Sequence, residues 1–296
     1  MRTANTVKVS LGPRGEYMLA RQDDFEYASD RLYRNEGGRF TDVTKAMGLL
    51  NAEFGLSAAI ADLNSDLTPD IFVGNDYVGY DQLLISGADK RWSNEAQQRL
   101  PHATFNSMGS DLADINNDGL TDIVCLDMTA SDPYRYKTLV MSANHSKHET
   151  LLAVGLGAQF SVNAMHINHG DGSFGDVAHL AGMAYTDWSW SPLLADLDND
   201  GWKDLLVTNG FLRDISNLDY ARYTMDSLQK EMNAGRITLT DWLTAIPSVK
   251  LRSYLFRNNG DLTFSDSSGR WNVGPPAFSN GAAYADLDND GDLDLV

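Results

Sequence analysis

The chain has little of what would place it in several large classes of protein. Its 296 residues include a single cysteine, Cys125, so no internal disulfide can form. No uninterrupted apolar run approaches the ~18 residues of a membrane span, so none is expected. Basic residues are few, 23 Lys and Arg against 41 Asp and Glu. The net charge of −18 argues against nucleic acid as a partner, because phosphate binding needs a basic footprint.

Signatures of common enzyme classes are also missing. There is no Gly-x-Ser-x-Gly elbow, no phosphate-binding loop ending in Gly-Lys-Ser/Thr and no dinucleotide fingerprint. The closest approach to a catalytic pattern is His145-Ser-Lys-His148-Glu149, which has neither residue order of a zinc-protease motif. We interpret this segment as a solvated insertion and predict no catalytic residue.

What the chain has in quantity is acid, arranged in a loop that occurs four times. Its best-formed copy is Asp286-Leu-Asp288-Asn-Asp290-Gly291-Asp-Leu-Asp294, and each copy is followed by an apolar run. Positions 1, 3, 5 and 9 of the loop carry a carboxylate or an amide in all copies: Asp62, Asn64, Asp66 and Asp70; Asp114, Asn116, Asp118 and Asp122; Asp196, Asp198, Asp200 and Asp204; Asp286, Asp288, Asp290 and Asp294. Repeated loops of this kind predict a repeat architecture.

These sixteen residues are predicted metal ligands, with Ca²⁺ as the cation. A hard cation needs six to eight oxygen ligands, and alternate side chains of a tight loop point at one centre. An EF-hand would need Glu at position 12 between helices, whereas valine or cysteine stands there and the flanks have strand-like sequences. We expect a structural role, in which the cation relieves the repulsion between crowded carboxylates and stabilises the fold.

The four loops are not equivalent. The copies that begin at Asp196 and Asp286 have four carboxylates and a glycine at position 6. The Asp62 copy has Leu67 in place of that glycine, so it is ranked weakest. If position 6 requires a positive φ, a leucine there costs about 1 kcal/mol or more.

A second repeat is a short hairpin with an Asn/Gly turn. It occurs at 31–43, 165–177 and 255–266. We expect one unit to run from such a hairpin through a small-residue linker to an Asp loop between two strands. Two hairpins per unit would form a four-stranded antiparallel sheet, the blade of a β-propeller. Unequal loop spacing predicts insertions at about 127–155 and 213–247, the second with helices over 218–232 and 240–246.

These motifs resemble the FG-GAP/VCBS repeats, which include the propeller head of integrin α subunits. Phrases such as Leu32-Tyr-Arg-Asn, Phe40-Thr-Asp-Val-Thr and Leu255-Phe-Arg-Asn-Asn-Gly resemble one branch more closely, the bacterial surface proteins related to cartilage acidic protein (ASPIC/UnbV-associated). The resemblance implies an all-β fold, with residues 1–296 forming one domain of about four or five blades from a ring of about seven. It also implies Ca²⁺ in the loops and a secreted, periplasmic or cell-surface location.

The resulting functional hypothesis is a calcium-binding β-propeller module for adhesion to an extracellular protein or glycan. Two alternatives remain open, a propeller enzyme acting on polysaccharide and a purely structural scaffold for another domain. The N-terminus has no apolar stretch typical of a signal peptide, and the chain stops directly after a strand-like run. We therefore expect a segment of a longer protein.

Overall fold

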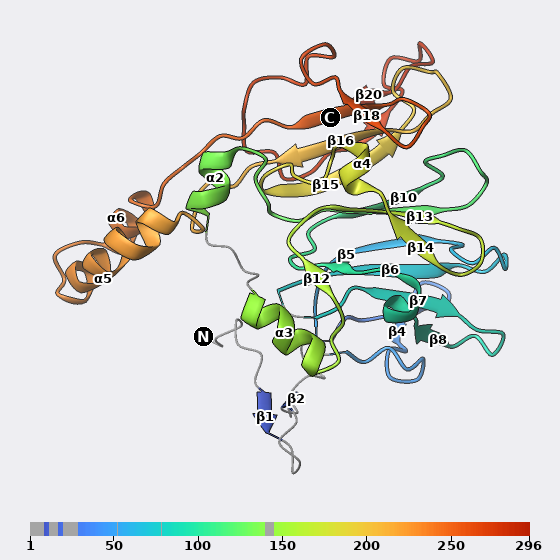
Figure 1. The fold of residues 1–296 in the computed structure, drawn as a ribbon, viewed down its shortest axis with the longest axis horizontal. Helices are drawn as coiled ribbons and strands as arrows, with labels where there is room; N and C mark the ends of the chain where they lie inside the picture. The colour runs from blue at the N-terminus through green and yellow to red at the C-terminus, as the bar shows by residue number, and fades with distance from the viewer. Residues whose placement is uncertain (1–8, 12–16, 20–28, 52, 78, 140–144) are drawn as a thin grey trace.

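The computed structural model describes residues 9–11, 17–19, 29–51, 53–77, 79–139 and 145–296. Three four-stranded antiparallel sheets dominate this part of the chain (Figure 1). The first contains β5 (Phe54–Ala61), β6 (Asp70–Asp76), β7 (Gln82–Ser86) and β8 (Trp92–Asn94). The second contains β10 (Ser110–Ala113), β11 (Asp122–Cys125), β13 (Ala164–Asn168) and β14 (Phe174–Asp176). The third contains β15 (Ser189–Ala195), β16 (Asp204–Asn209), β17 (Tyr254–Asn258) and β18 (Phe264–Asp266).

Four smaller pairs of strands complete the β-structure. Three are antiparallel hairpins: β1 (Val9–Leu11) with β2 (Tyr17–Leu19), β3 (Tyr33–Asn35) with β4 (Phe40–Asp42), and β19 (Tyr284–Ala285) with β20 (Asp294–Leu295). The fourth is a parallel pair of β9 (Ala103–Thr104) and β12 (Gln159–Phe160). The predicted all-β class with four-stranded antiparallel sheets is therefore confirmed. The described residues form a stack of sheets and not a closed ring.

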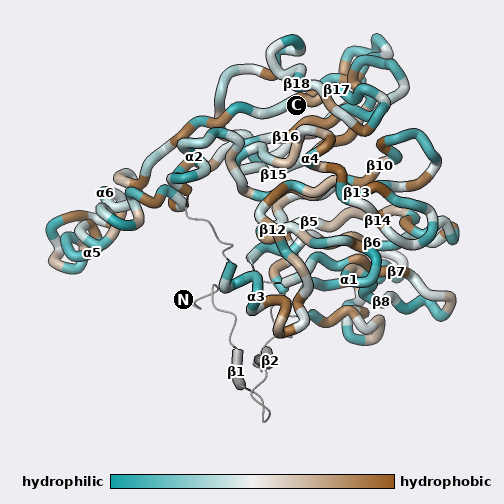
Figure 2. Tube along the Cα trace, viewed as in Figure 1, coloured by the Kyte–Doolittle hydropathy of each residue, from teal (hydrophilic) through white to brown (hydrophobic). Residues whose placement is uncertain are grey.

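The core lies between the stacked sheets. Strand β11 is buried on both faces because its residues alternate between two neighbours. Ile123 and Cys125 face the first sheet and pack in one cluster with Phe72, while Val124 faces the third sheet and packs in another with Leu205. Cys125 is a buried free cysteine. Figure 2 shows hydrophobic residues concentrated along these stacked strands.

The repeated hairpins belong to different sheets from the ones predicted. The sequence unit places a hairpin before its Asp loop, but the second and third hairpins join the sheet of the preceding loop. The hairpin β13–β14 pairs with β11, which leaves the loop at Asp114, and β17–β18 pairs with β16, which leaves the loop at Asp196. Consequently β3–β4 has no Asp-loop strands beside it, and β19–β20 has no outer hairpin, within the described ranges.

Short helices lie outside the stacked sheets. They are α1 (Ala96–Arg99), α2 (Pro133–Thr138), α3 (His145–Ala153), α4 (Ala178–Ala181), the π-helical η2 (Tyr220–Thr224), α5 (Met225–Asn233) and α6 (Leu239–Thr244). The two helical segments predicted in the second insertion are confirmed by η2–α5 and α6, which project away from the sheets (Figure 1). None of the helices in the described ranges combines the length and apolarity needed to cross a bilayer.

A half-buried arginine holds the two insertions together. Arg135 on α2 donates to Asp187 at 2.6 and 2.9 Å and to Asp214 at 3.1 Å. Asp187 lies just before β15, and Asp214 begins the second insertion, so one guanidinium joins three segments that are distant in sequence. All three side chains are at most 16% exposed.

Candidate cation-binding loops

Each Asp loop is closed by its first carboxylate. In the second copy, Asp114 Oδ1 accepts from the backbone N–H of Asp118 at 3.1 Å and Oδ2 accepts from that of Gly119 at 2.9 Å. The carboxylates of Asp62, Asp196 and Asp286 accept the equivalent pair of bonds. Position 1 therefore turns the chain so that the side chains at positions 3 and 5 lie above the same loop.

Two residues of each loop have left-handed backbone. Position 6 has φ of +67° at Leu67 and +87° at Gly119, so the left-handed backbone on which the predicted strain at Leu67 depends is present. Position 4 is also left-handed, as at Ser65 with φ +62° and Asn117 with φ +56°. We did not predict the second requirement. The recurrence of Asn at position 4 was the available signal, because Asn tolerates this conformation better than most residues.

The carboxylate at position 9 is buried at the base of the first three loops. Asp122 is fully buried; its Oδ2 accepts from Ile115 N at 2.9 Å and its Oδ1 from Asn168 N at 2.8 Å. Burial raises the pKa of Asp122 and of Asp204 to about 6, despite these backbone bonds. Asp294, in the last copy, is exposed. Position 9 thus fixes the loop to the sheet as well as offering oxygen atoms to the site.

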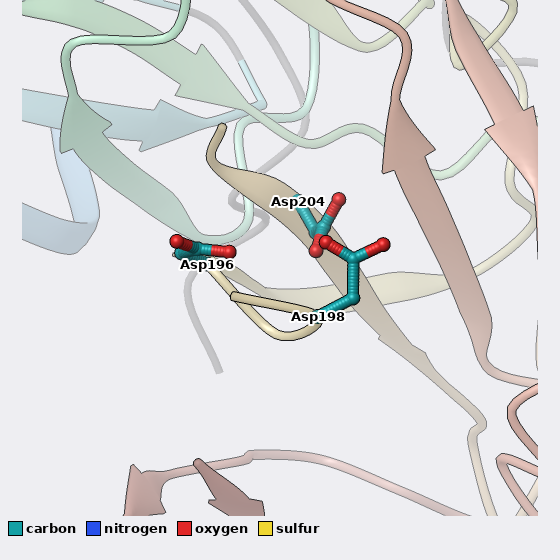
Figure 3. A group of neighbouring side chains, drawn as sticks. All are labelled: Asp196, Asp198 and Asp204. Atoms are coloured by element: carbon teal, nitrogen blue, oxygen red, sulfur yellow. The ribbon is translucent and has the colours of Figure 1, made fainter. Parts of the chain in front are cut away.

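Carboxylate oxygens converge in two of the four loops. Asp196, Asp198 and Asp204 offer oxygens that all lie within 4.8 Å of one another (Figure 3). Asp286, Asp288 and Asp294 form the same arrangement. These are the two loops ranked highest from their sequences.

The other two loops form no such three-carboxylate group among the described residues, since position 3 is an amide. Asn64 Nδ2 donates to Asp66 Oδ2 at 3.0 Å, and Asn116 Nδ2 donates to Asp118 Oδ2 at 2.9 Å. An amide donor thereby engages the acid at position 5.

Arg257 lies against the third loop and was not predicted. Its Nε donates to Asp198 Oδ2 at 2.6 Å, and its Nη2 donates to Asp200 Oδ2. The guanidinium reaches the loop from β17, the neighbouring strand in the same sheet. Sequence patterns could not place it there, because the contact joins residues nearly sixty positions apart.

Neighbouring loops are linked by asparagine side chains. Asn258 Nδ2 donates to the carbonyl of Ile115 in the second loop at 3.0 Å and to that of Lys203 in the third at 3.1 Å. Asn168 joins the first and second loops in the same way. Asn117 Nδ2 also donates to Gly201 O at 3.0 Å. The loops therefore form one connected edge of the stack.

The histidines of the first insertion form no catalytic constellation among the residues described. His145 and His148 both lie on α3, and His148 stacks on Phe160 with ring centroids 5.4 Å apart. Neither histidine belongs to a group of three or more side chains placed to hold a metal.

Comparison with known families agrees with the repeated loops. Three segments match the FG-GAP-like repeat, at residues 62–125, 149–207 and 239–296. They cover more than half of the chain, and all four Asp loops lie within them. The chain therefore belongs to the FG-GAP-like repeat family. No curated protein matches it.

Proposed function

We propose that the chain is a calcium-stabilised module for binding an extracellular or cell-surface protein or glycan. In this proposal the sheets are blades of a β-propeller, and the protein is secreted or surface-exposed, as is typical of FG-GAP repeats. The observation that carries the calcium proposal is the convergence of Asp196, Asp198 and Asp204 on a strand-anchored loop. The same convergence at Asp286, Asp288 and Asp294 supports a structural use of the cation.

The residues present fit Ca²⁺. In the third and fourth loops, the carboxylates at positions 1, 3, 5 and 9 offer only oxygen ligands, which is what a hard cation prefers. When bound, the cation would neutralise the mutual repulsion of these acids and hold the turn closed. Binding free energy would then become folding free energy, since the unfolded chain has no preformed site.

Calorimetric titration with Ca²⁺ tests the proposal. We expect saturable binding that weakens when Asp196 and Asp198 are both changed to Asn, because two charges of the third loop are removed. Asp261→Asn is the control for removing an acid elsewhere, as Asp261 is exposed in the β17–β18 turn and accepts bonds from Thr263. Equal heats for all three proteins, or no binding by the wild type, would refute the calcium assignment.

The ligand-binding part needs its own test. Immobilised protein, loaded with Ca²⁺, is presented with panels of glycans and extracellular proteins. Saturable retention without any chemical change in the ligand supports a binding module. Turnover of a polysaccharide would instead indicate an enzyme.

A further inference from the structure

A cavity of about 430 Å³ lies at the strand ends opposite to the Asp loops. The starts of β5 and β15 contribute Leu56 and Trp190, and the chain leaving β6 and β11 contributes Asp76 and Asp127. Both insertions contribute to the lining: the first provides Leu139, and the second provides residues 215–216. An isolated bridge between Leu139 and Asn217 joins the two insertions beside it.

The polar end of the cavity presents acceptor atoms. Asp76 is 9% exposed; its Oδ1 accepts from Tyr77 N at 2.8 Å and from Asn106 Nδ2 at 3.3 Å. Asp76 Oδ2 and Asn106 Oδ1 have no donor within the described ranges, and neither is among the side-chain atoms sealed from solvent. Both oxygens therefore keep access to solvent, and the two residues that carry them line the cavity.

Asp127 adds a second carboxylate to this end. It is 1% exposed and accepts backbone N–H bonds from Phe105, Asn106 and Met128. The described lining contains no lysine or arginine. Burial raises the pKa of Asp76 to about 6, which is the response of a carboxylate without a cationic partner.

The side-chain donors of the lining are largely engaged or enclosed. Trp190 Nε1 donates to Gly210 O at 2.6 Å, and Thr129 Oγ1 donates to Ser161 O at 2.7 Å. Trp188 Nε1 is sealed from solvent. The hydroxyl of Tyr77, which can donate or accept, is an exception. A ligand suited to this cavity must therefore supply donors.

Aromatic rings also line the cavity. Trp188 stacks on Phe211 with centroids 4.6 Å apart and planes 2° apart, and Trp190 lies 6.0 Å from the same ring. Stacking among these rings agrees with the packing role expected for large aromatics, yet Trp188, Trp190 and Phe211 remain half-buried and line the cavity. Aromatic faces attract organic cations as well as apolar groups.

We propose that this cavity binds an ammonium or guanidinium group, carried by a free amine or by a lysine or arginine side chain of a protein. Such a group donates to Asp76 and Asn106, neutralises the buried acids and lies against the aromatic wall. An anion is disfavoured by the same carboxylates. A hydrated metal ion is disfavoured because the aromatic wall offers no oxygen, and the three-carboxylate groups lie elsewhere. This inference deepens the proposed binding role and rests on it.

The test uses the calcium-loaded chain and titration calorimetry with defined probes. Nα-acetyl-lysine amide and Nα-acetyl-arginine amide represent protein side chains, and spermidine represents free amines. Nα-acetyl-norleucine amide and methyl glucoside are neutral controls. We expect saturable binding of at least one cationic probe, weakened roughly tenfold to a hundredfold by Asp76→Asn. Glu149→Gln makes the same change of charge on the exposed face of α3 and should have no effect.

Binding by either amino-acid amide identifies a protein side chain as the source, and binding by spermidine alone identifies a free amine. The proposal is overturned if no cationic probe binds, if a neutral probe binds as well, or if Asp76→Asn leaves binding unchanged. Displacement of the probe by further Ca²⁺ would overturn it too, since the cavity would then hold a metal. The proposed calcium role is tested separately, by the Ca²⁺ titration of the Asp-loop variants.

Discussion

Replacing Leu67 by glycine should stabilise the protein, although Leu67 is an apolar residue. Its φ of +67° is left-handed, which costs an L-residue with a Cβ about 1–2 kcal/mol. Its side chain is 92% exposed, so little apolar burial is lost on truncation. Glycine offsets about 0.5–1 kcal/mol of this gain, because it has greater conformational freedom in the unfolded chain. The net expectation is a gain of about 0.5–1 kcal/mol in the free energy of unfolding.

The matched control is the reverse change in the next loop. Gly119 has φ +87°, and a Cβ added there would meet nothing within 4 Å, so Gly119→Leu tests backbone strain without a clash. It should destabilise by a similar amount. Both variants are measured by urea unfolding in EDTA, with unchanged m-values showing that only stability has moved. If Leu67→Gly were neutral or destabilising while Gly119→Leu lost stability, strain at Leu67 would be refuted.

Three further changes test the packing around the loops and insertions. Arg135→Met should lower the unfolding free energy by about 3 kcal/mol or more, because it leaves two buried carboxylates unpaired. Arg236→Met, which breaks an exposed pair, should leave the unfolding free energy almost unchanged in the same urea assay. Asn258→Ala should cost about 2 kcal/mol or more, since the amide satisfies carbonyls of two loops; a loss below 0.5 kcal/mol would show that the bridge is dispensable. His102→Gln should cost most between about pH 4 and 6.5. Burial opposes protonation of His102, but the hydrogen bond and charge of Asp176 outweigh it and raise the pKa of His102, while Asp176, although buried, has its pKa lowered to about 2. The pair's contribution is therefore lost as the pH rises through the raised value of His102 or falls towards that of Asp176, and a pH-independent cost would contradict the ion pair.

Local sequence was sufficient for the loops themselves. The spacing of carboxylates predicted which side chains share a turn, and the glycine at position 6 predicted the left-handed backbone found at Leu67. Short-range signals also predicted the helices of the second insertion, because helical periodicity and caps are local properties.

Contacts between distant segments could not be predicted in this way. Which hairpin belongs to which sheet depends on strand pairing. The alternation of residues along a strand does not indicate which other strand it pairs with. Strands β7 and β8 were missed because their turn lacks the Asn-Gly signal of the other hairpins. The approach of Arg257 to the third loop and the bridges made by Asn258 follow from that pairing, so they became visible only with the fold.

The cavity illustrates the same limit. Asp76 and Trp188 are more than a hundred residues apart, and nothing in either local sequence predicts that they line one cavity. Stacking the sheets brings the ends of β6, β11 and β16 together, and the insertions then enclose the space. A binding site built in this way depends on the stack remaining ordered, which connects it to whatever stabilises the Asp loops.

The most direct test of the central claim is the unfolding temperature of the whole chain in EDTA and in millimolar Ca²⁺. A site occupied at a hundred times its dissociation constant adds ~2.7 kcal/mol, so the two loops with converging carboxylates would add about 5 kcal/mol. For a chain of this size that corresponds to a rise of roughly 8–9 °C. We predict such a rise, and a smaller one when Asp196, Asp198, Asp286 and Asp288 are replaced by Asn. An unfolding temperature that is the same in EDTA and in Ca²⁺ would contradict the account.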